Sequence, residues 1–518
     1  MTSPAGPNKW LVAFTVMIPT FIEILDMTVV NVSLNHIQGS LSAGLDEVTW
    51  VLTSYLVSNA IVIPMSGWLA SRIGRRRYLF LSIGLFTLSS FACGSATSLA
   101  MLVLFRVFQG IGGGGLQPLS NAILLETFPP EEHGKAMAIF GMGIVFAPIL
   151  GPVLGGWITD NWTWRWIFYL NIPIGILSIV MTMLFIQDPP YLRKRGTKID
   201  YAGIALLIVG IGCLQLVLDR GERLDWFASP FIRNLSILSA TALVLFVVTE
   251  LGRSNPIVDL RVYRDGSFAV GNLIMFLGFF AFFASLVLLP VYVQKLMGYT
   301  PWWAGWVLAP GGVSSLFMMP LTAKLMQKVD ARKLLLAGLA INAYALYLMA
   351  GFSLEADFRA ILWPRVVQGI GLGLFFVPVA TLTVGRVPKE RMGNASAVFN
   401  LLRNLGGSFG VAVMTTQLAR RTQFHHHRLT EHLTPYDPQF QETLQRMVGW
   451  LDMHMGMGQQ HGLAQALGLI HGELSRQAFM LAFNDAFFLD SFFFLVPVFL
   501  VFFLRKSEPG AGPAAGAH

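Results

Sequence analysis

Long apolar stretches, separated by short polar segments, run through almost the whole of this 518-residue chain. A membrane-spanning helix needs about 20 mostly apolar residues. The first stretch is too long for a signal-peptide core and carries two acidic residues, so we expect it to be a retained helix. The pattern predicts an all-α membrane protein with fourteen spanning helices, at residues 10–34, 49–70, 78–97, 99–125, 136–158, 166–187, 200–219, 231–251, 268–294, 302–326, 333–353, 360–386, 394–419 and 480–504.

A motif in the fourth predicted helix returns near the other end of the chain. Arg106 and Gln109 recur as Arg365 and Gln368, at an offset of 259 residues. The same offset relates Pro129, Glu131, Gly134, Ala136, Ala138 and Phe140 to Pro388, Glu390, Gly393, Ala395, Ala397 and Phe399. A duplicated membrane unit of this kind is how many transporters build two halves around a central site.

The repeat predicts three parts of the chain. Predicted helices one to six correspond to helices nine to fourteen, whereas helices seven and eight have no counterpart. We therefore expect an N-terminal six-helix half at 1–190, two extra helices that link the halves at 191–265, and a C-terminal six-helix half at 266–518.

Composition supports one membrane bundle. Of all residues, 54% are hydrophobic and 12% are charged, whereas a soluble domain carries roughly 25% charged residues. The net charge of +8 comes from cations that cluster between apolar stretches, which indicates topology rather than nucleic-acid binding. The two cysteines lie inside apolar stretches, so we expect no disulfide.

Lysine and arginine also indicate the orientation. They are concentrated in one set of connections, for example at residues 72–77, 193–198 and 324–333. The short loops on the opposite side carry only Arg165, Arg220, Arg223, Lys295 and Arg359. The positive-inside rule then places both termini in the cytoplasm.

The segment 421–479 is polar and differs from the rest of the chain. Apolar residues recur at helical spacing over 440–455 and 463–474, and Gly456 and Gly458 interrupt the pattern between them. This predicts a helical hairpin on the periplasmic side, which would either dock a partner protein or cap the pore mouth. His425, His426 and His427 are adjacent and cannot all face one ion on a helix, so we expect no metal site and no cofactor.

Asp26 is the sharpest chemical feature, because it sits in the middle of the first helix. A carboxylate in a bilayer must face a wet cavity, pair with a cation or be protonated, so Asp26 is a candidate proton carrier. Glu23 lies one turn earlier and joins it as a second candidate. Arg106, a buried cation, would hold Asp26 ionised in one state and release it in another. The alternatives are that Asp26 only fixes helix packing and that Arg106 forms a static pair.

Glycines and prolines mark a second functional region. In the fifth helix Gly143, Ala147, Gly151 and Gly155 recur every four residues and form a smooth stripe for close packing. Pro148 and Pro152 bend the same helix, so we expect it to seal the two halves against each other.

The loop after the second helix holds Gly67, Arg72, Gly74 and Arg76. Its arginines would dock on acidic groups and helix C-termini at the cytoplasmic face and so bias the open and closed states. The alternative is that they only set the topology.

A substrate cavity is expected between the halves. Phenylalanines crowd the ninth helix and suit a large apolar pocket. The residues that we expect to line it are Met27, Asn31, Gln109, Phe276, Phe280, Gln368 and Arg403. The glycine run 112–115 is not followed by a Lys-Ser/Thr pair, so it is no phosphate loop, and an ion gradient is the expected energy source.

These segments resemble the signatures of proton-coupled drug antiporters of the major facilitator superfamily. The loop 67–77, the Arg106 segment and the stretch 147–156 carry the resemblance. Residues 25–32 and 164–173 are similar to the fourteen-helix branch, the EmrB/QacA family, and 218–227 and the long last loop are similar to its EmrB-type members. One departure is Ser71, which stands where this superfamily usually has an acidic residue.

The resemblance implies the major facilitator fold and a multidrug exporter of the inner membrane. It also implies a tripartite efflux pump, in which the chain works with an EmrA-like periplasmic adaptor and a TolC-like outer-membrane channel. We therefore expect proton-driven export of amphipathic toxic compounds by alternating access and no enzyme activity, with Asp26 taking up the proton from outside. An Asp26→Asn variant should then fold and lose efflux. The alternatives are an uptake symporter or facilitator for a small solute, and a non-transporting membrane scaffold.

Overall fold

The computed structural model describes residues 8–189, 200–253, 256–385, 387–431, 433–455 and 458–505. Within them every regular element is a helix, as expected where lipid offers the backbone no hydrogen-bond partners. The α-helices are α1 (Lys9–Ser40), α2 (Leu45–Val48), α3 (Trp50–Ile73), α4 (Arg75–Gly94), α5 (Leu99–Gly113), α6 (Leu116–Thr127), α7 (His133–Asn161), α8 (Trp166–Tyr169), α9 (Asn171–Phe185), α10 (Tyr201–Arg220), α11 (Pro230–Gly252), α12 (Gly266–Lys295), α13 (Pro301–Leu325), α14 (Ala331–Met349), α15 (Phe358–Val384), α16 (Met392–Thr430), α17 (Pro438–Met455) and α18 (Gly458–Val501). Short 3-10 helices are η1 (Pro130–Glu132), η2 (Trp226–Ala228), η3 (Leu260–Arg264) and η4 (Lys389–Arg391).

Several sequence-based predictions fall outside the described residues. These are the boundary after residue 190, the basic run 193–198, the last residue of the predicted span 360–386, and Gly456. The division into two halves and a linking pair stays a prediction.

Thirteen helical segments of the described chain are long and apolar enough to cross a membrane. The remaining predicted span, 333–353, coincides with α14, whose first turn holds Arg332 and Lys333 and is therefore less apolar. Each of the other predicted stretches coincides with one of the thirteen segments. The prediction of an all-α, multi-pass membrane protein is confirmed.

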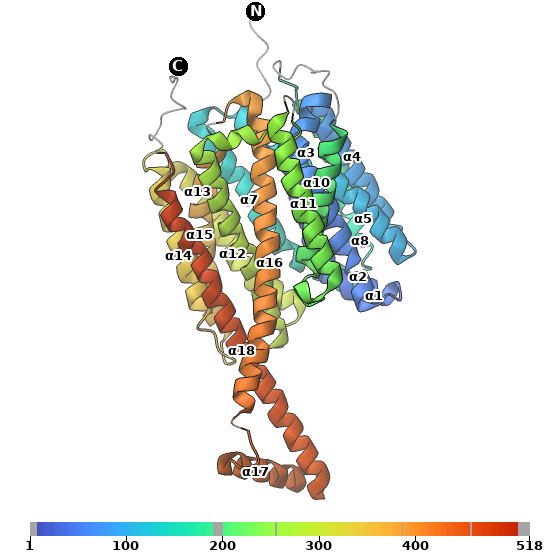
Figure 1. Cartoon of the computed structure of the whole chain (residues 1–518), viewed down its shortest axis with the longest axis vertical. Helices are drawn as coiled ribbons and strands as arrows, with labels where there is room; N and C mark the ends of the chain where they lie inside the picture. Colours follow the sequence, from blue (N-terminus) through green and yellow to red (C-terminus); the bar gives the residue numbers. More distant parts are fainter. Residues whose placement is uncertain are drawn as a thin grey trace, which may run out of the picture.

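The spanning helices form one bundle, and α17 lies beyond one end of it (Figure 1). We call this the α17 end, and we call the other end, where α3 meets α4 at residues 67–77, the motif end. The predicted helical arm at 440–455 is α17, whereas the arm at 463–474 is continuous with the last span in α18. The first residues of the segment also prolong α16 as far as Thr430. Placement of the α17 end in the periplasm stays a prediction.

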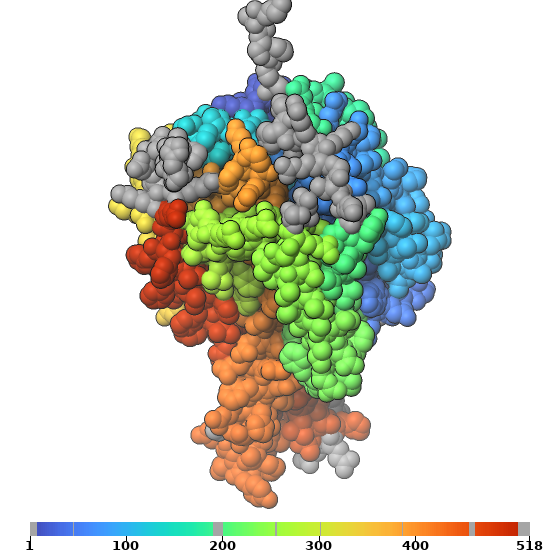
Figure 2. Space-filling model, turned by 45° about the horizontal axis from the view of Figure 1, so that its top comes forward, coloured from blue at the N-terminus to red at the C-terminus, as the bar shows by residue number. Residues whose placement is uncertain are grey.

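The two helices without a repeat counterpart lie on the outside of the bundle. In Figure 2, α10 and α11 (green) form a band between the blue N-terminal helices and the orange and red C-terminal helices. The helix α10 packs against α11, α3 and α16. Its first turn is capped by Asp200, whose carboxylate accepts a hydrogen bond from the Gly203 amide at 2.7 Å.

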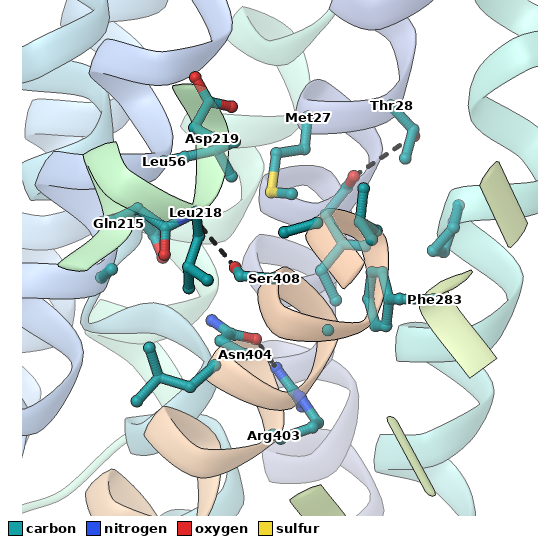
Figure 3. A pocket seen from close by; sticks show the side chains of 18 of the residues that line it. Met27, Thr28, Leu56, Gln215, Leu218, Asp219, Phe283, Arg403, Asn404 and Ser408 are labelled. Carbon is teal, nitrogen blue, oxygen red and sulfur yellow. Dashed lines mark hydrogen bonds between the residues drawn. The ribbon is translucent and has the colours of Figure 1, made fainter. Parts of the chain in front are cut away.

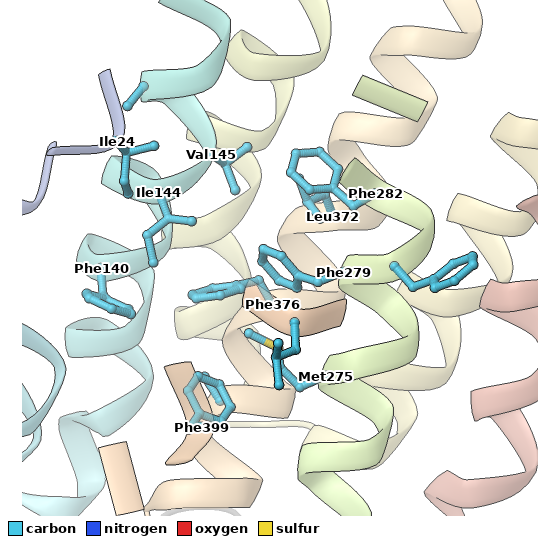
Figure 4. Packing of buried hydrophobic residues seen from close by; sticks show 14 of the residues in the cluster. Ile24, Phe140, Ile144, Val145, Met275, Phe279, Phe282, Leu372, Phe376 and Phe399 are labelled. Carbon is cyan, nitrogen blue, oxygen red and sulfur yellow. The ribbon is translucent and has the colours of Figure 1, made fainter. Parts of the chain in front are cut away.

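Phenylalanines hold the interior together between α7 and the helices α12, α15 and α16 (Figure 4). The ring of Phe140 lies 6.3 Å from that of Phe376, and Phe376 lies 5.9 Å from Phe279. Phe399 of α16 is fully buried beside them. We call these four rings the phenylalanine cluster; they connect helices that the repeat assigns to different halves.

Candidate functional site

A cavity of about 360 Å³ lies inside the bundle (Figure 3). Its walls come from α1, α3, α6, α7, α10, α12 and α16, and most of the lining is apolar. The polar and charged lining residues are Thr28, Asn59, Gln117, Gln215, Asp219, Glu222, Arg223, Arg403, Asn404, Ser408 and Thr415. A largely apolar pocket of this size with a few polar groups is typical of a site for a small amphipathic molecule.

The cavity reaches toward the α17 end and is closed toward the motif end. It includes Asp219 at the end of α10 and Glu222 and Arg223 in the connection from α10 to α11. On α7 and α16 the lining begins at Ile144 and Leu401, just beyond Phe140 and Phe399 of the phenylalanine cluster. At the motif end itself, a Cβ added to Gly67 of α3 would lie 2.8 Å from the carbonyl oxygen of Gly393 in α16. The two helices therefore meet backbone to backbone there.

Asp26 is buried in a complete hydrogen-bond shell. Its carboxylate pairs with Arg106 Nη1 at 2.5 Å, and both side chains are fully buried. The other oxygen accepts hydrogen bonds from Gln109 Nε2 at 3.0 Å and from Asn171 Nδ2 at 2.7 Å. Of the alternatives given for a carboxylate in a bilayer, pairing with a cation is the one seen in this structure, and Asp26 is not among the residues that line the cavity.

Arg106 is held from several sides. Its guanidinium lies 4.1 Å from the ring centre of Tyr55 and 5.8 Å from that of Phe168, and such contacts stabilise a desolvated cation. Its Nε donates to the Val51 carbonyl at 3.0 Å. In this structure the Asp26–Arg106 pair fixes α1 against α3, α5 and α8, which agrees with the static alternative.

Glu23, one turn before Asp26, contacts a different set of helices. Its carboxylate accepts hydrogen bonds from Tyr55 at 3.2 Å, from Asn59 at 2.9 Å and from Gln117. Asn59 and Gln117 line the cavity, and the Gln117 carbonyl accepts from Arg403 of α16. We call Glu23, Gln117 and Arg403 the polar bridge, since they connect α1 to α16 beside the cavity.

The second half of the repeat has the same arginine and glutamine but no carboxylate. Arg365 donates to Gln368 within α15, as Arg106 donates to Gln109 at 2.8 Å within α5. Gln368 in turn donates to Ser285 at 2.9 Å. Ser285 stands 259 residues after Asp26, so the duplicated site carries a hydroxyl where the first copy carries an acid.

The residues predicted for the cavity are distributed over several places. Met27 and Arg403 line it. Gln109 belongs to the Asp26 shell and Gln368 to the Ser285 contact. Two phenylalanines pack away from it, Phe276 at 5.7 Å from Phe409 and Phe280 at 4.0 Å from Phe493, and Asn31 is exposed outside the lining. The sequence pattern did not single out Asn59 and Gln117, because an isolated amide in an apolar helix shows no periodic signal.

The glycine stripe of α7 allows close packing on α1. A Cβ on Gly151 would lie 2.0 Å from Thr28 Oγ1, and one on Gly155 would lie 3.0 Å from the Val29 carbonyl. At Gly143 the nearest atom would be the flexible end of Met17, at 2.4 Å. Pro148 lines the cavity, and Pro152 lies within the same continuous helix.

Another face of α7 packs closely against α13. A Cβ on Gly305 of α13 would lie 2.8 Å from Val153 Cγ2. One on Gly312 of the same helix would lie 2.4 Å from Ile149 Cδ1. The helix α7 therefore lies between α1 and α13, which supports the expected seal.

Enlarging Gly151 is expected to destabilise this packing. We expect Gly151→Ala to lower the free energy of unfolding by about 1–3 kcal/mol, the usual cost of overpacking. Gly156→Ala is the matched control, since a Cβ there has nothing within 4 Å. Thermal midpoints of the two purified variants test this; equal midpoints would show that the stripe is not a tight contact.

The loop at the motif end is fixed by Asp188. Gly74 has a φ of 90° and a Cβ there would lie 2.6 Å from Asp188 Oδ2, so glycine is required. The Arg76 amide donates to Asp188 at 2.9 Å, and the Arg76 side chain donates to the Met183 carbonyl at 2.5 Å. Arg72 lies 5.5 Å from the ring of Trp68. The Arg76 side chain therefore docks on the C-terminal end of α9, whereas Asp188 is bound by the main-chain amide of Arg76 and not by its guanidinium.

Comparison with known proteins decides the family. The sequence pattern of the Major Facilitator Superfamily matches residues 16–411. The chain belongs to the Major Facilitator Superfamily. This superfamily protein is 38% identical over 514 residues to the multidrug export protein EmrB of Escherichia coli (strain K12), covering 99% of this chain and 98% of that protein. It is also 38% identical over 509 residues to the fatty acid resistance protein FarB of Neisseria gonorrhoeae, covering 98% and 97%.

A solved structure shows the same fold. The human organic anion transporter MFSD10 (TETRAN) matches with a TM-score of 0.62 at 15% identity, covering 96% of this chain and 100% of that chain. The predicted resemblance to the EmrB/QacA family is confirmed by the match to EmrB, and these Major Facilitator Superfamily relatives are transporters rather than enzymes.

Proposed function

We propose that this chain exports hydrophobic or amphipathic drugs and toxins across a membrane by alternating access, driven by proton uptake. The observation that carries the proposal is the position of the polar bridge. It brings a buried carboxyl group, Glu23, into contact with two residues that line a largely apolar cavity. The relatives support the export direction, since one is a multidrug export protein and another a fatty acid resistance protein.

Proton coupling is assigned to Glu23, Asp26 and Arg106 with different roles. Glu23 accepts hydrogen bonds only from neutral groups in the described structure, whereas Asp26 is paired directly with a guanidinium. Protonation of Asp26 would cost that ion pair, so Glu23 takes up the proton in the state seen here. Asp26 and Arg106 keep α1 in place while this happens.

Proton uptake acts on the contact between α1 and α16. A protonated Glu23 accepts more weakly from Gln117, and the Arg403 charge then loses the carboxylate that balances it through that amide. The polar bridge weakens, and the equilibrium shifts toward a state in which α6 and α16 separate at this point. The glycine stripe of α7 would seal the two halves against leakage of protons or compound. The loop that holds Gly67, Arg72, Gly74 and Arg76 would bias the open and closed states at the motif end.

The cell context follows from the same proposal. The motif end lies in the cytoplasm with both termini, and the chain lies in the inner membrane. The helix α17, together with the ends of α16 and α18 that extend beyond the bundle, offers a surface at the periplasmic side for an EmrA-like adaptor that leads to a TolC-like channel. Toxin susceptibility of cells that express the chain with and without such an adaptor tests this part.

The transport cycle is tested in proteoliposomes. Addition of an amphipathic compound on the motif side, with an inward proton gradient from the α17 side, should produce compound export and proton entry together. Movement of compound and protons in the same direction would instead indicate an uptake symporter. Absence of any gradient-driven movement would reject the proposal.

A further inference from the structure

The two helices that have no repeat counterpart do more than connect the halves. The helix α10 and the residues directly after it contribute five lining residues to the cavity, which are Gln215, Leu218, Asp219, Glu222 and Arg223. In Figure 3, Gln215 and Leu218 lie beside Ser408 of α16 and on the same cavity as Met27 of α1. The first helix of the linking pair, α10, is therefore part of the cavity wall.

Polar contacts fix α10 to helices on both sides of the cavity. Gln215 Nε2 donates to Ser408 Oγ of α16 at 3.1 Å, and the Trp226 indole donates to Thr416 of α16 at 2.9 Å. On the other side, Thr53 of α3 donates to Asp219. A Cβ on Gly212 would meet Ile61 of α3 at 3.4 Å, so α10 also packs closely there.

This placement closes one side of the cavity. At the motif end α3 and α16 touch directly, where Gly67 faces Gly393. Toward the α17 end α10 contacts both of them. A compound in the cavity would therefore touch α10 rather than lipid on this side.

We propose that Leu218 and Gln215 are specificity-determining residues of the exporter. Leu218, of which 6% is exposed, limits the size of the apolar part that fits. Gln215 and Ser408 form a hydrogen bond with each other, and a polar group of the compound would break it and bind the freed amide or hydroxyl. The compounds are uncharged or charged amphipathic molecules with one hydrogen-bonding group near a compact apolar body. This inference rests on the proposed function.

A volume scan at Leu218 tests the inference. Export of a graded series of amphipathic compounds is measured in proteoliposomes for Leu218→Trp and Leu218→Ala. We expect Leu218→Trp to reduce export of the larger compounds roughly tenfold relative to the smaller ones, as pocket contacts discriminate by size, and Leu218→Ala to shift the preference the other way. Val209→Trp is the matched control on α10, because Val209 is 37% exposed on its outer face. Identical profiles for the two tryptophan variants would overturn the inference.

A labelling experiment covers the case in which tryptophan prevents folding. Leu218→Cys, in a background with Cys93→Ala and Cys213→Ala, is treated with a membrane-impermeant maleimide from the α17 side. We expect labelling that a transported compound slows, whereas Ile208→Cys, on the outer face within the same membrane-spanning helix, should stay unlabelled by the impermeant reagent. No labelling of residue 218 would overturn the inference. If the parent chain moves no compound at all, the proposed function fails, whereas labelling still reports whether Leu218 faces an accessible cavity.

Discussion

Asp26→Asn is expected to destabilise the protein so strongly that little of it accumulates folded in the membrane. The substitution leaves the Arg106 guanidinium fully buried without its carboxylate, at a site where the pair was 2.5 Å apart. Removing one partner of a buried ion pair costs about 3–5 kcal/mol, which is a large share of the stability of a folded domain. This outcome differs from the sequence-based expectation of a folded but inactive variant, because the structure shows a direct pair. Membrane levels and thermal midpoints of the tagged protein measure it.

The double variant Asp26→Asn with Arg106→Gln is the control. With both charges gone, two amides replace the pair, and we expect much of the lost stability to return, since neutral replacement of a buried pair is often tolerated. The stable double variant should still couple export to protons through Glu23. A stable double variant without any coupling would transfer the role of proton carrier to Asp26.

The fold was largely predictable from hydropathy, because lipid requires helices about as long as the bilayer is thick. Thirteen predicted spans satisfied length and hydropathy in the described chain, and α14 only lacked apolar residues in its first turn. The continuity of the arm at 463–474 with the last span was not predictable. Polar residues mark the end of a membrane segment in a sequence, but they do not end a helix.

The site was only partly predictable from the sequence. Helical periodicity tells how two side chains are oriented relative to each other around one helix, but it does not tell which neighbouring helix each side chain faces. Glu23 and Asp26 are three residues apart, so their side chains differ in direction by roughly 60° around α1. That rotation is enough to point Glu23 at α3 and α6 and Asp26 at α5 and α9. The partners that decide the difference, Asn59 and Gln117, come from other helices, and hydropathy does not reveal which helices pack on which face.

The duplication makes the asymmetry of the site informative. Both copies keep an arginine and a glutamine three residues apart, yet the acid is present only in the first copy. Arg403, in the second half, finds its balancing carboxylate through Gln117 in the first half. The only buried carboxylates that touch these arginines and amides in the described chain are therefore on α1, which concentrates proton coupling on that helix.

Glu23→Gln is expected to fold like the parent chain and to lose proton coupling. The side-chain carbonyl of the new glutamine at position 23 can still accept from Gln117. The NH₂ group of the new glutamine can donate to the Tyr55 hydroxyl and to the carbonyl of a rotated Asn59 amide, so the number of hydrogen bonds is conserved. The variant cannot exchange a proton at this position. With one proton per cycle, a pH difference of one unit supports about a tenfold concentration ratio of the compound, and in Glu23→Gln we expect this ratio to fall to about one.

The matched control for this variant is Tyr55→Phe. It removes one hydrogen bond to the same carboxylate but keeps both the acid and the aromatic ring that stacks on Arg106. We expect Tyr55→Phe to retain gradient-driven accumulation with a shifted pH profile, because a hydrogen bond to the ionised form is lost. Accumulation ratios at several pH differences, measured with compound exchange at equal pH as a check of the intact pathway, separate the two variants. A tenfold ratio in Glu23→Gln would remove Glu23 from the coupling mechanism, and the role would return to Asp26.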